Sequence, residues 1–497
     1  MHTNFLNKCS GHFMEYFPED LLGAHSKLIM DPVHGGIPLF PHEVTVIDHP
    51  LFQRLRNICQ NDILSLVFPG ATHSRFLHSI GVMHVGERIF LSMVKSYLET
   101  RHYKSKTKTS NAQFFAIDYF NKVIRLACLL HDCGHSSFSH QFTRVSSIKK
   151  MMSDPDLFKK LWKGNTPSEL YASSPEIIEH EHYSIRCAYQ LLQETNVQAS
   201  GINPIDVLSI METTSPTPSD LFCEHSKHFW EFIVGEKNTS APALVRELLS
   251  SIISGEVDAD RADYMLRDGF HSSVTIGGFN LDHLLSNLRF GWEPTEPWLG
   301  LAVTSKGLSA LEDFVYSRYQ MYRHVYAHKT ALGFDWLLRE AINEVLEDKK
   351  ISDYVQLCLT DLNEFRHLTD NYFWECFRNY ARKKPASYSY CIINRIKLKH
   401  VDTQLDLSTE QVDSNKTLLA KKLNIHVEDV VSCTMNAKFS KIRENFNQIR
   451  VLVKDPISHQ HELKLITEVS SFFNKFTDGT ITHFYRKPNQ LVGKLKL

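Results

Sequence analysis

The chain has 497 residues, 42% hydrophobic and 22% charged, which is the composition of a globular protein with about two to four domains. Its formal net charge of −1 excludes a global field that would attract nucleic acid or a membrane surface. The ten cysteines form no C-x-x-C pair, and we find no signal peptide and no membrane-spanning run. We therefore expect an intracellular protein, cytoplasmic or nuclear, with reduced thiols.

Most of the chain before residue 350 is patterned as helices joined by short loops. After a poorly patterned tail over 1–25, residues 74–94 carry apolar side chains at helical spacing, with Ser74 as a suitable cap. Residues 101–113 are basic and polar, which favours a solvated loop. Further helical patterns cover 180–195, 243–269 with a break at Gly255, and 311–346.

The pattern changes after about residue 350. Short segments rich in β-branched and aromatic residues, bounded by turn residues, predict strands over 388–398, 427–437, 449–455 and 479–487. We therefore predict a mostly α protein with a helical core and a smaller α+β C-terminal region. The predicted divisions are an N-terminal tail (1–25), the helical core (26–345), a helical connector (346–389) and the α+β region (390–497).

A cluster of titratable residues follows the apolar run 123–130. His131, Asp132, His135 and His140 occur within ten positions, and burying all of them is costly unless each has a partner. Metal ligation removes that cost, since imidazole and carboxylate suit Mn, Fe, Zn or Ni, and extra carboxylates and water suit Mg. Adjacent helical residues diverge by about 100°, so His131 and Asp132 share an ion only near a helix end or in a cleft. Further ligands must come from other helices.

Two further candidates lie elsewhere in the chain. His78 is on the helix predicted over 74–94. Asp260, Tyr264 and Asp268 fall at i, i+4 and i+8, which places them in one polar stripe. Such a stripe is ordinarily a solvated face, but the apolar residues around it favour a face that lines an interior cleft.

The pattern H…HD…D, formed by His78, His131–Asp132 and Asp260, resembles that of the HD-domain metal-dependent phosphohydrolases. The whole set of motifs more closely resembles the sterile-alpha-motif/HD-domain dNTP triphosphohydrolases of animals and their bacterial relatives. The resemblance covers residues 26–345 well and the β-rich tail weakly, and we expect the sterile-alpha-motif domain to be absent. The motifs are KLIMDPVHGGIPL, FQRLRNICQ, VFPGATHSRFLHSIGV, HDCGHSSFSHQF, HEHYS, VDADRADYMLRD and YRHVYAHK.

This resemblance implies an HD-domain helical core that cleaves a dNTP into deoxynucleoside and inorganic triphosphate. It also implies activation by GTP or dGTP through assembly into a dimer or tetramer, with the C-terminal region serving regulation and oligomerisation. The implied cofactor is a divalent metal, Fe, Mn, Zn, Ni or Mg, as one or two ions. Carried over by position, the implied ligands are His78, His131, Asp132 and Asp260.

The resemblance also assigns the other site residues. The implied catalytic residues are His135, His140 and His180, with His140 as the general acid. The implied contacts to phosphates and sugar are Gln60, Arg75, Arg261, Tyr264, Asp268, Arg318 and Tyr326. The implied guanine-nucleotide activator site, between subunits, comprises Lys27, Asp48, Gln53 and Arg56.

Four positions differ from the family pattern. Arg261 stands where the animal enzymes have Lys, and Ala327 replaces a Gln that helps to hold the phosphates. Asn61 replaces a Leu beside the sugar, and Met30 replaces an Asn of a second activator site. These differences bear on discrimination against a 2′-hydroxyl and on control by two nucleotides.

Two alternative functions stay open at this point. The same metal site could serve another nucleotide: a ribonucleoside triphosphate, an alarmone or a cyclic dinucleotide. A protein of a different class would sense nucleotides or bind nucleic acid with little turnover. The near-neutral charge and the lack of a long basic stripe count against nucleic acid, and we expect no membrane partner.

Overall fold

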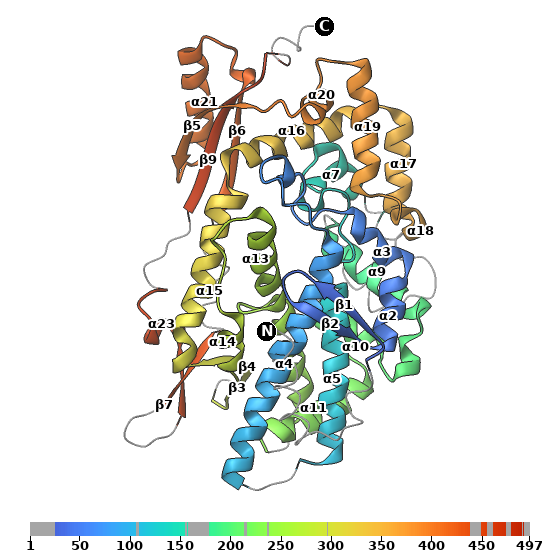
Figure 1. Ribbon diagram of the computed structural model, residues 1–497, viewed down its shortest axis with the longest axis vertical. Helices are drawn as coiled ribbons and strands as arrows, with labels where there is room; N and C mark the ends of the chain where they lie inside the picture. Colours follow the sequence, from blue (N-terminus) through green and yellow to red (C-terminus); the bar gives the residue numbers. More distant parts are fainter. Residues whose placement is uncertain are drawn as a thin grey trace.

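The computed structural model describes residues 25–105, 109–154, 157, 178–212, 216–235, 238–295, 297–437, 449–454, 461–473, 479–489 and 491. Within these ranges the chain is predominantly helical, with a few small sheets (Figure 1). The predicted fold class, mostly α with a smaller α+β C-terminal region, is therefore confirmed. The predicted tail over 1–25 lies outside the described residues, apart from His25.

Two long helices, α4 (Arg75–Ser105) and α5 (Asn111–Leu130), pack side by side in the core (Figure 1). Ser110 caps α5, because its Oγ accepts the backbone N–H of Gln113 while its own N–H donates to the Gln113 side chain. The apolar face of α5 is buried as far as its last residue. His131 then follows at the helix terminus, where a side chain can turn away from the core.

Helix α4 is longer than the sequence pattern predicts. It begins directly after Ser74 and continues to Ser105, so the loop predicted over 101–113 is wrong for residues 101–105. Lys and Arg are good helix formers, and a basic run therefore prolongs a helix without needing apolar contacts of its own.

Shorter helices surround the α4–α5 pair: α6 (Ser139–Phe142), α7 (Ser146–Met152), α9 (His180–Glu194), η4 (Val197–Ser200), α10 (Pro204–Met211), α11 (Asp220–Ile233), α12 (Ala241–Ser254), α13 (Ala259–Ser272) and α14 (Leu281–Ser286). Helices α10 and α11 contact α5, helices α13 and α14 contact α4, and α12 contacts both. Helix α12 ends at Gly255, as predicted, and a short turn leads into α13.

A β-hairpin precedes the core and was not predicted. Strands β1 (Lys27–Asp31) and β2 (Gly35–Leu39) pair antiparallel. Asp31 closes their turn by accepting the backbone N–H groups of Val33 and His34, and Gly35 adopts φ +77°, which suits glycine. The hairpin leads into α2 (Pro41–Asp48), α3 (Pro50–Gln53), η1 (Arg54–Asn57) and η2 (Leu64–Leu66).

The helical stretch predicted over 311–346 is interrupted. Helix α15 (Leu308–Met321) runs into a π-helical turn, η6 (Tyr322–Tyr326), and α16 (Lys329–Val345) begins afresh with His328 as its cap. A π turn widens the helix locally and often occurs at functional sites.

Helices α17 (Lys349–Thr360), α18 (Leu362–Phe365), α19 (Asp370–Lys383) and α20 (Tyr388–Ile393) follow. The strand predicted over 388–398 is wrong, because α20 occupies its first half. Ser387 caps this helix by accepting the N–H of Tyr390. The carboxylate of Glu344 also accepts the N–H of Ser389, so the helix N-terminus is well satisfied.

The other three predicted strands are confirmed, but they lie in two sheets. β6 (Val430–Ala437) pairs with β9 (Gly479–Arg486), which also pairs with β5 (Lys399–Leu405), and α21 (Thr409–Leu423) contacts β6. β7 (Arg450–Lys454) instead leaves this sheet and pairs parallel with β4 of the core. That sheet has the order β3 (Leu288–Glu293), β4 (Trp298–Thr304), β7, β8 (His461–Leu465).

Three short elements complete the described chain: η5 (Ser305–Gly307), η7 (Val427–Asp429) and α23 (Ile466–Val469). None of the described helices combines the length and the apolar character that crossing a membrane requires.

Candidate active site

The four predicted metal ligands converge from separate parts of the chain. His78 lies one turn into α4, His131 and Asp132 follow α5, and Asp260 lies in the first turn of α13. The Nε2 atom of His78 is 3.0 Å from Asp260 Oδ1 and 3.6 Å from Asp132 Oδ2. The Nε2 atom of His131 is 3.5 Å from Asp132 Oδ2 and 3.7 Å from Asp260 Oδ1. We call these four residues the metal-type centre.

Helix termini place the carboxylates of this centre. The side chain of Asp258 caps α13 by accepting the backbone N–H of Arg261 at 2.7 Å. This cap fixes the first turn of α13, where the positive end of the helix dipole favours the negative charge of Asp260. Asp132 follows the end of α5 and makes an ion pair with the guanidinium of Arg75.

Hydrogen bonds fix the tautomers of both histidines. His78 Nδ1 donates to the Asp263 carboxylate at 2.8 Å, and His131 Nδ1 donates to the carbonyl oxygen of Cys128 at 2.8 Å. Each ring therefore turns its Nε2 toward the carboxylates. This arrangement, a histidine oriented by a carboxylate or carbonyl behind it, is typical of metal-ligating histidines.

Asp263 was not predicted from the sequence. Its buried carboxylate accepts hydrogen bonds from His34 Nε2 at 2.7 Å and from Arg267 at 2.9 Å, in addition to His78. The sequence feature that could have indicated this role is the position of Asp263 one helical turn after Asp260, on the same face of α13.

The donor set of the metal-type centre fits a divalent metal ion. The Nε2 atoms of His78 and His131 are buried and face the carboxylates of Asp132 and Asp260. Burial lowers the pKa of His78, but Asp260 and Asp263 outweigh this effect and raise the pKa to about 10. Burial raises the pKa of Asp260, but His131 and His78 hold that pKa below its ordinary value. The two carboxylates therefore favour positive charge at these rings, and a divalent cation bound by the two imidazoles and two carboxylates would take the place of the His78 proton.

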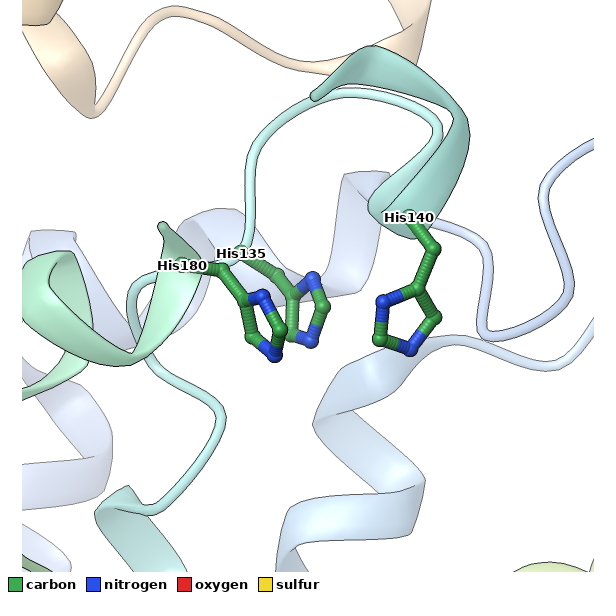
Figure 2. A group of neighbouring side chains, drawn as sticks. All are labelled: His135, His140 and His180. Atoms are coloured by element: carbon green, nitrogen blue, oxygen red, sulfur yellow. The ribbon is translucent and has the colours of Figure 1, made fainter. Parts of the chain in front are cut away.

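The three predicted catalytic histidines form a second cluster. His135 lies in the loop after α5, His140 on α6 and His180 at the start of α9. Their ring centroids are separated by 4.0 Å (His135–His180), 4.8 Å (His135–His140) and 5.0 Å (His140–His180). Figure 2 shows the His135 and His180 rings against each other and His140 across from them. His135 Nε2 is 3.3 Å from Asp132 Oδ1, so this three-histidine cluster adjoins the metal-type centre.

Close packing of the backbone makes the three-histidine cluster possible. A Cβ atom on Gly134 would lie 2.0 Å from the backbone nitrogen of Ser184, so only glycine lets the loop after α5 approach α9. Burial lowers the pKa of His140 to about 3, with the charge of Arg75 as the next cause. Burial also lowers the pKa of His180 to about 4, although Asp132 opposes the effect. The cluster is therefore uncharged at neutral pH.

A cavity of about 480 Å³ opens beside both clusters. Among the described residues, its wall includes Arg75 and His140, which link it to the metal-type centre and the three-histidine cluster. Asp268 lies in the wall and is held by His73 Nε2 at 2.7 Å and by the hydroxyl of Tyr326. Five of the predicted substrate contacts line the cavity: Gln60, Arg75, Tyr264, Asp268 and Tyr326.

Two predicted phosphate contacts, Arg261 and Arg318, are not among the lining residues. Arg261 bonds to the carbonyl of Gly255 and lies 3.4 Å from Asp258. Arg318 lies with its guanidinium carbon 5.4 Å from the ring centroid of Tyr322. Tyr322 does line the cavity and was not predicted. It lies one turn after Arg318, in the π turn η6.

The four residues of the predicted activator site lie on the surface near the β-hairpin. Lys27 Nζ is 3.4 Å from Asp48 Oδ2, and both side chains are exposed. Arg56 Nε donates to Gln53 Oε1 at 2.7 Å. None of the four lines the cavity, and their role stays a prediction.

Comparisons with known proteins place this geometry in context. No protein-family model matches the chain. Over 386 residues it is 26% identical to the deoxynucleoside triphosphate triphosphohydrolase SAMHD1 of Bos taurus, covering 72% of this chain and 58% of that protein. Over 400 residues it is 23% identical to the SAMHD1 homolog of Dictyostelium discoideum, covering 80% and 64%. An uncharacterized protein of Methanocaldococcus jannaschii is 26% identical over 387 residues, covering 76% and 64%. The chain thus spans less than two thirds of the length of these relatives.

A solved structure shows the same fold. It is a phosphohydrolase from Bacteroides thetaiotaomicron, with a TM-score of 0.63 and 20% identity, covering 93% of this chain and all of that one. The sequence likenesses confirm the predicted resemblance to HD-domain dNTP triphosphohydrolases, and the solved structure shows that the fold is shared.

Proposed function

We propose that this chain, an HD-domain protein similar to the dNTP triphosphohydrolases, uses a divalent metal to hydrolyse dNTPs into deoxynucleoside and inorganic triphosphate. The observation that carries the proposal is the arrangement of two clusters beside one cavity. A metal-type centre of two imidazoles and two carboxylates adjoins three uncharged histidines, and Arg75 and His140 extend from this junction into the cavity wall. A triphosphate requires a cation, an anion-binding group and a proton donor in one place.

His78, His131, Asp132 and Asp260 would hold the metal. When bound there, a divalent cation supplies Lewis acidity toward the phosphoryl oxygens. The chain holds its ligands in place beforehand, since Asp263 and the Cys128 carbonyl fix the two imidazoles.

Arg75 binds and orients the phosphates in this proposal. Its guanidinium is buried between Asp132 and Ser139, whose Oγ accepts from Arg75 Nε at 2.6 Å. This anchoring keeps the arginine rotamer fixed, so phosphate binding costs little side-chain entropy.

His140 supplies the proton to the leaving 5′-oxygen. In the free protein the three histidines are uncharged, which leaves their ring nitrogens able to accept a proton. The negative charge of a bound triphosphate raises the pKa of a nearby imidazole, so substrate binding itself prepares the acid. His135 and His180 position His140 by packing against its ring.

Asp268, Tyr326 and Gln60 orient the sugar. Asp268 is fixed by His73 and by the Tyr326 hydroxyl, so its carboxylate is an aligned acceptor for a 3′-hydroxyl. The Oε1 atom of Gln60 is buried without a hydrogen bond. A sugar hydroxyl would satisfy it.

A ribonucleoside triphosphate is the second candidate substrate. The observation that favours it is Asn61, which lines the cavity beside Gln60 and has a buried Nδ2 with no acceptor. An additional hydroxyl on the sugar would provide that acceptor.

Activation by GTP or dGTP, with assembly into a dimer or tetramer, is the remaining part of the proposal. The exposed Lys27–Asp48 pair and the Gln53–Arg56 pair are the residues we assign to the activator. Arg56 and Lys27 supply the positive charge that a nucleotide phosphate needs.

The direct test is product analysis. Purified protein with Mn²⁺ is incubated with each dNTP and each NTP, with and without GTP, and the products are resolved by ion-pair chromatography. Inorganic triphosphate and deoxynucleoside are expected. Monophosphate with pyrophosphate would place the cleavage at a different bond and would refute the proposed reaction.

A further inference from the structure

The cavity wall contains charged side chains that the proposed reaction does not use. These are Asp62, Arg144, Asp335 and Arg339, in addition to the groups assigned to phosphates and sugar. They come from three separate segments of the chain, and the strand β6 from the C-terminal region closes the same cavity with residues 432–435. A nucleotide whose triphosphate lies at Arg75 and whose sugar lies at Asp268 has its base left to contact this wall.

Asp62 presents an acceptor without a partner. Its backbone adopts φ +50°, a left-handed conformation that Asp tolerates better than most residues. Its Oδ1 is buried and makes no hydrogen bond. Leaving such an atom unpaired is costly, so a strained residue that buries a free carboxylate oxygen in a cavity is suited to a ligand.

Asp335 and Arg339 provide an acceptor and a donor one helical turn apart on α16. Arg339 Nη1 donates to Gln141 Oε1 at 2.9 Å, which holds the guanidinium at the wall. Burial raises the pKa of Asp335 to about 6, against the charges of Arg339 and Arg144. Asp62 and Asp335 line the same cavity, with Arg144 and Arg339 in the same wall.

Among the natural bases, guanine fits this combination best. It presents two neighbouring N–H donors, N1–H and the N2 amino group, and two neighbouring acceptors, O6 and N7. Carboxylates only accept when ionised, and guanidinium groups only donate. Adenine and cytosine each present one amino group, and thymine presents one N–H, so each leaves part of the charged wall unpaired.

We infer that Asp62, Asp335, Arg144 and Arg339 form a nucleobase site that selects guanine, the carboxylates accepting from N1–H and N2 and the guanidinium groups donating to O6 and N7. This inference rests on the proposed function, since it assigns the base of the same substrate. The substrate class is therefore a guanine nucleoside triphosphate, with dGTP preferred over the other dNTPs.

The test compares kcat/KM for dGTP, dATP, dCTP, dTTP, dITP and 7-deaza-dGTP, all with Mn²⁺ and the same saturating GTP, so that the activator is constant. Each lost charge-assisted hydrogen bond is worth about tenfold or more. We expect dGTP to exceed dATP, and both dITP, which lacks the N2 amino group, and 7-deaza-dGTP, which lacks N7, to fall at least about tenfold below dGTP.

Substitution of the two carboxylates tests which residues contact the guanine base. In Asp335→Asn and Asp62→Asn we expect the ratio of dGTP to dITP to approach one, while dATP changes by less than about twofold. Asn tolerates the left-handed backbone at position 62, so this second variant removes charge without a new backbone strain. Asp353→Asn, an exposed substitution on α17, is the matched control and should keep the wild-type ratios.

The outcomes separate this inference from the proposed function. Equal rates for all four bases, or an equal loss with every dNTP in Asp335→Asn, would overturn the guanine site while leaving the hydrolase in place. If no dNTP is hydrolysed, the proposed function fails. Calorimetric binding of dGTP and dATP in EDTA, without GTP because GTP would compete for a guanine site, then still decides the base site: tighter dGTP binding that Asp335→Asn abolishes supports it, and equal binding refutes it.

Discussion

The metal-type centre and the three-histidine cluster adjoin each other, but their surroundings act on imidazole in opposite ways. In the first, Asp260 and Asp263 outweigh burial and raise the pKa of His78. In the second, burial and Arg75 lower the pKa of His140. Asp132 of the metal-type centre links the two, since its carboxylate lies near both His78 and His135.

This difference indicates a division of labour. Histidines held by carboxylates behind and beside them suit a cation, whereas buried histidines next to an arginine remain neutral until an anion arrives. A spacing of nine residues in the sequence, from His131 to His140, therefore separates two chemical roles. The following predictions test that separation, from the largest expected effect to the smallest.

His131→Ala should abolish turnover and bound metal together, with the fold retained. Loss of a metal ligand removes several kcal/mol of transition-state stabilisation, so we expect a decrease in kcat of about 10³-fold or more. Metal content by mass spectrometry and phosphate release by chromatography measure both effects. His367→Ala, an exposed histidine outside both clusters, is the control. Full activity in His131→Ala would remove the argument for the metal.

His140→Ala should separate the two clusters. Removing a general acid lowers kcat by about 10²- to 10⁴-fold, while the metal-type centre keeps all its ligands. We therefore expect slow turnover with wild-type metal content. Loss of metal from this variant would contradict the division of labour, because it would make His140 part of the metal centre.

Asp263→Asn should weaken the metal without removing a ligand. The carboxylate that orients His78 would be lost, and such outer groups change metal affinity by about 10- to 100-fold. Titration of the apo protein with Mn²⁺ measures the change, with the melting temperature recorded in parallel because Asp263 also binds Arg267. Unchanged affinity in a folded variant would show that the Cys128 carbonyl and packing suffice to orient the centre.

Removal of the metal should lower the stability of the fold. Without a cation the ligand carboxylates and imidazoles lose their common partner, and a ligand at about 100 times its Kd stabilises the folded state by about 2.7 kcal/mol. Thermal unfolding in EDTA and after addition of Mn²⁺ measures this difference. His131→Ala should show no such shift, which ties the effect to the centre and not to surface binding.

The last prediction concerns how the stability of the fold depends on pH through Asp335 of the cavity wall. The pKa of Asp335 is raised to about 6 in the fold, above its ordinary value near 3.8. The folded protein therefore keeps a proton that the unfolded chain has released, so stability decreases as pH rises from about 4 to about 6 and is then constant. Asp335→Asn should flatten this part of the curve in urea unfolding, and an unchanged slope would assign the effect to other carboxylates.

Much of the fold followed from local patterns in the sequence. The strands around Val431, Val451 and Phe484 were predictable because alternation and β-branched residues are local signals. The strand predicted at 388–398 was wrong because its cap at Ser387 and the distant Glu344 favour a helix. A local sequence pattern cannot indicate that Ser389 bonds to Glu344, which lies 45 residues earlier in the chain.

The candidate site shows the same limit. The His131–Asp132 pair stands out in the sequence because it ends an apolar helix. Asp263 does not, because its role appears only when His78 packs against it. Asp335 of α16 and the β6 strand meet in one cavity only through tertiary structure, so the wall of the base site could not be predicted from spacing.

The C-terminal strands have a consequence for how this protein can be shortened or exchanged. β7 extends the sheet begun by β4, with Val451 opposite Val303, and β6 supplies part of the cavity wall. A chain cut before β6 would keep every proposed metal ligand but would expose an edge of β4 and leave the cavity open on one side. An exchange of the C-terminal region with that of a related protein would therefore have to preserve two contacts with the core: the pairing of β7 with β4, and the position of β6 in the cavity wall.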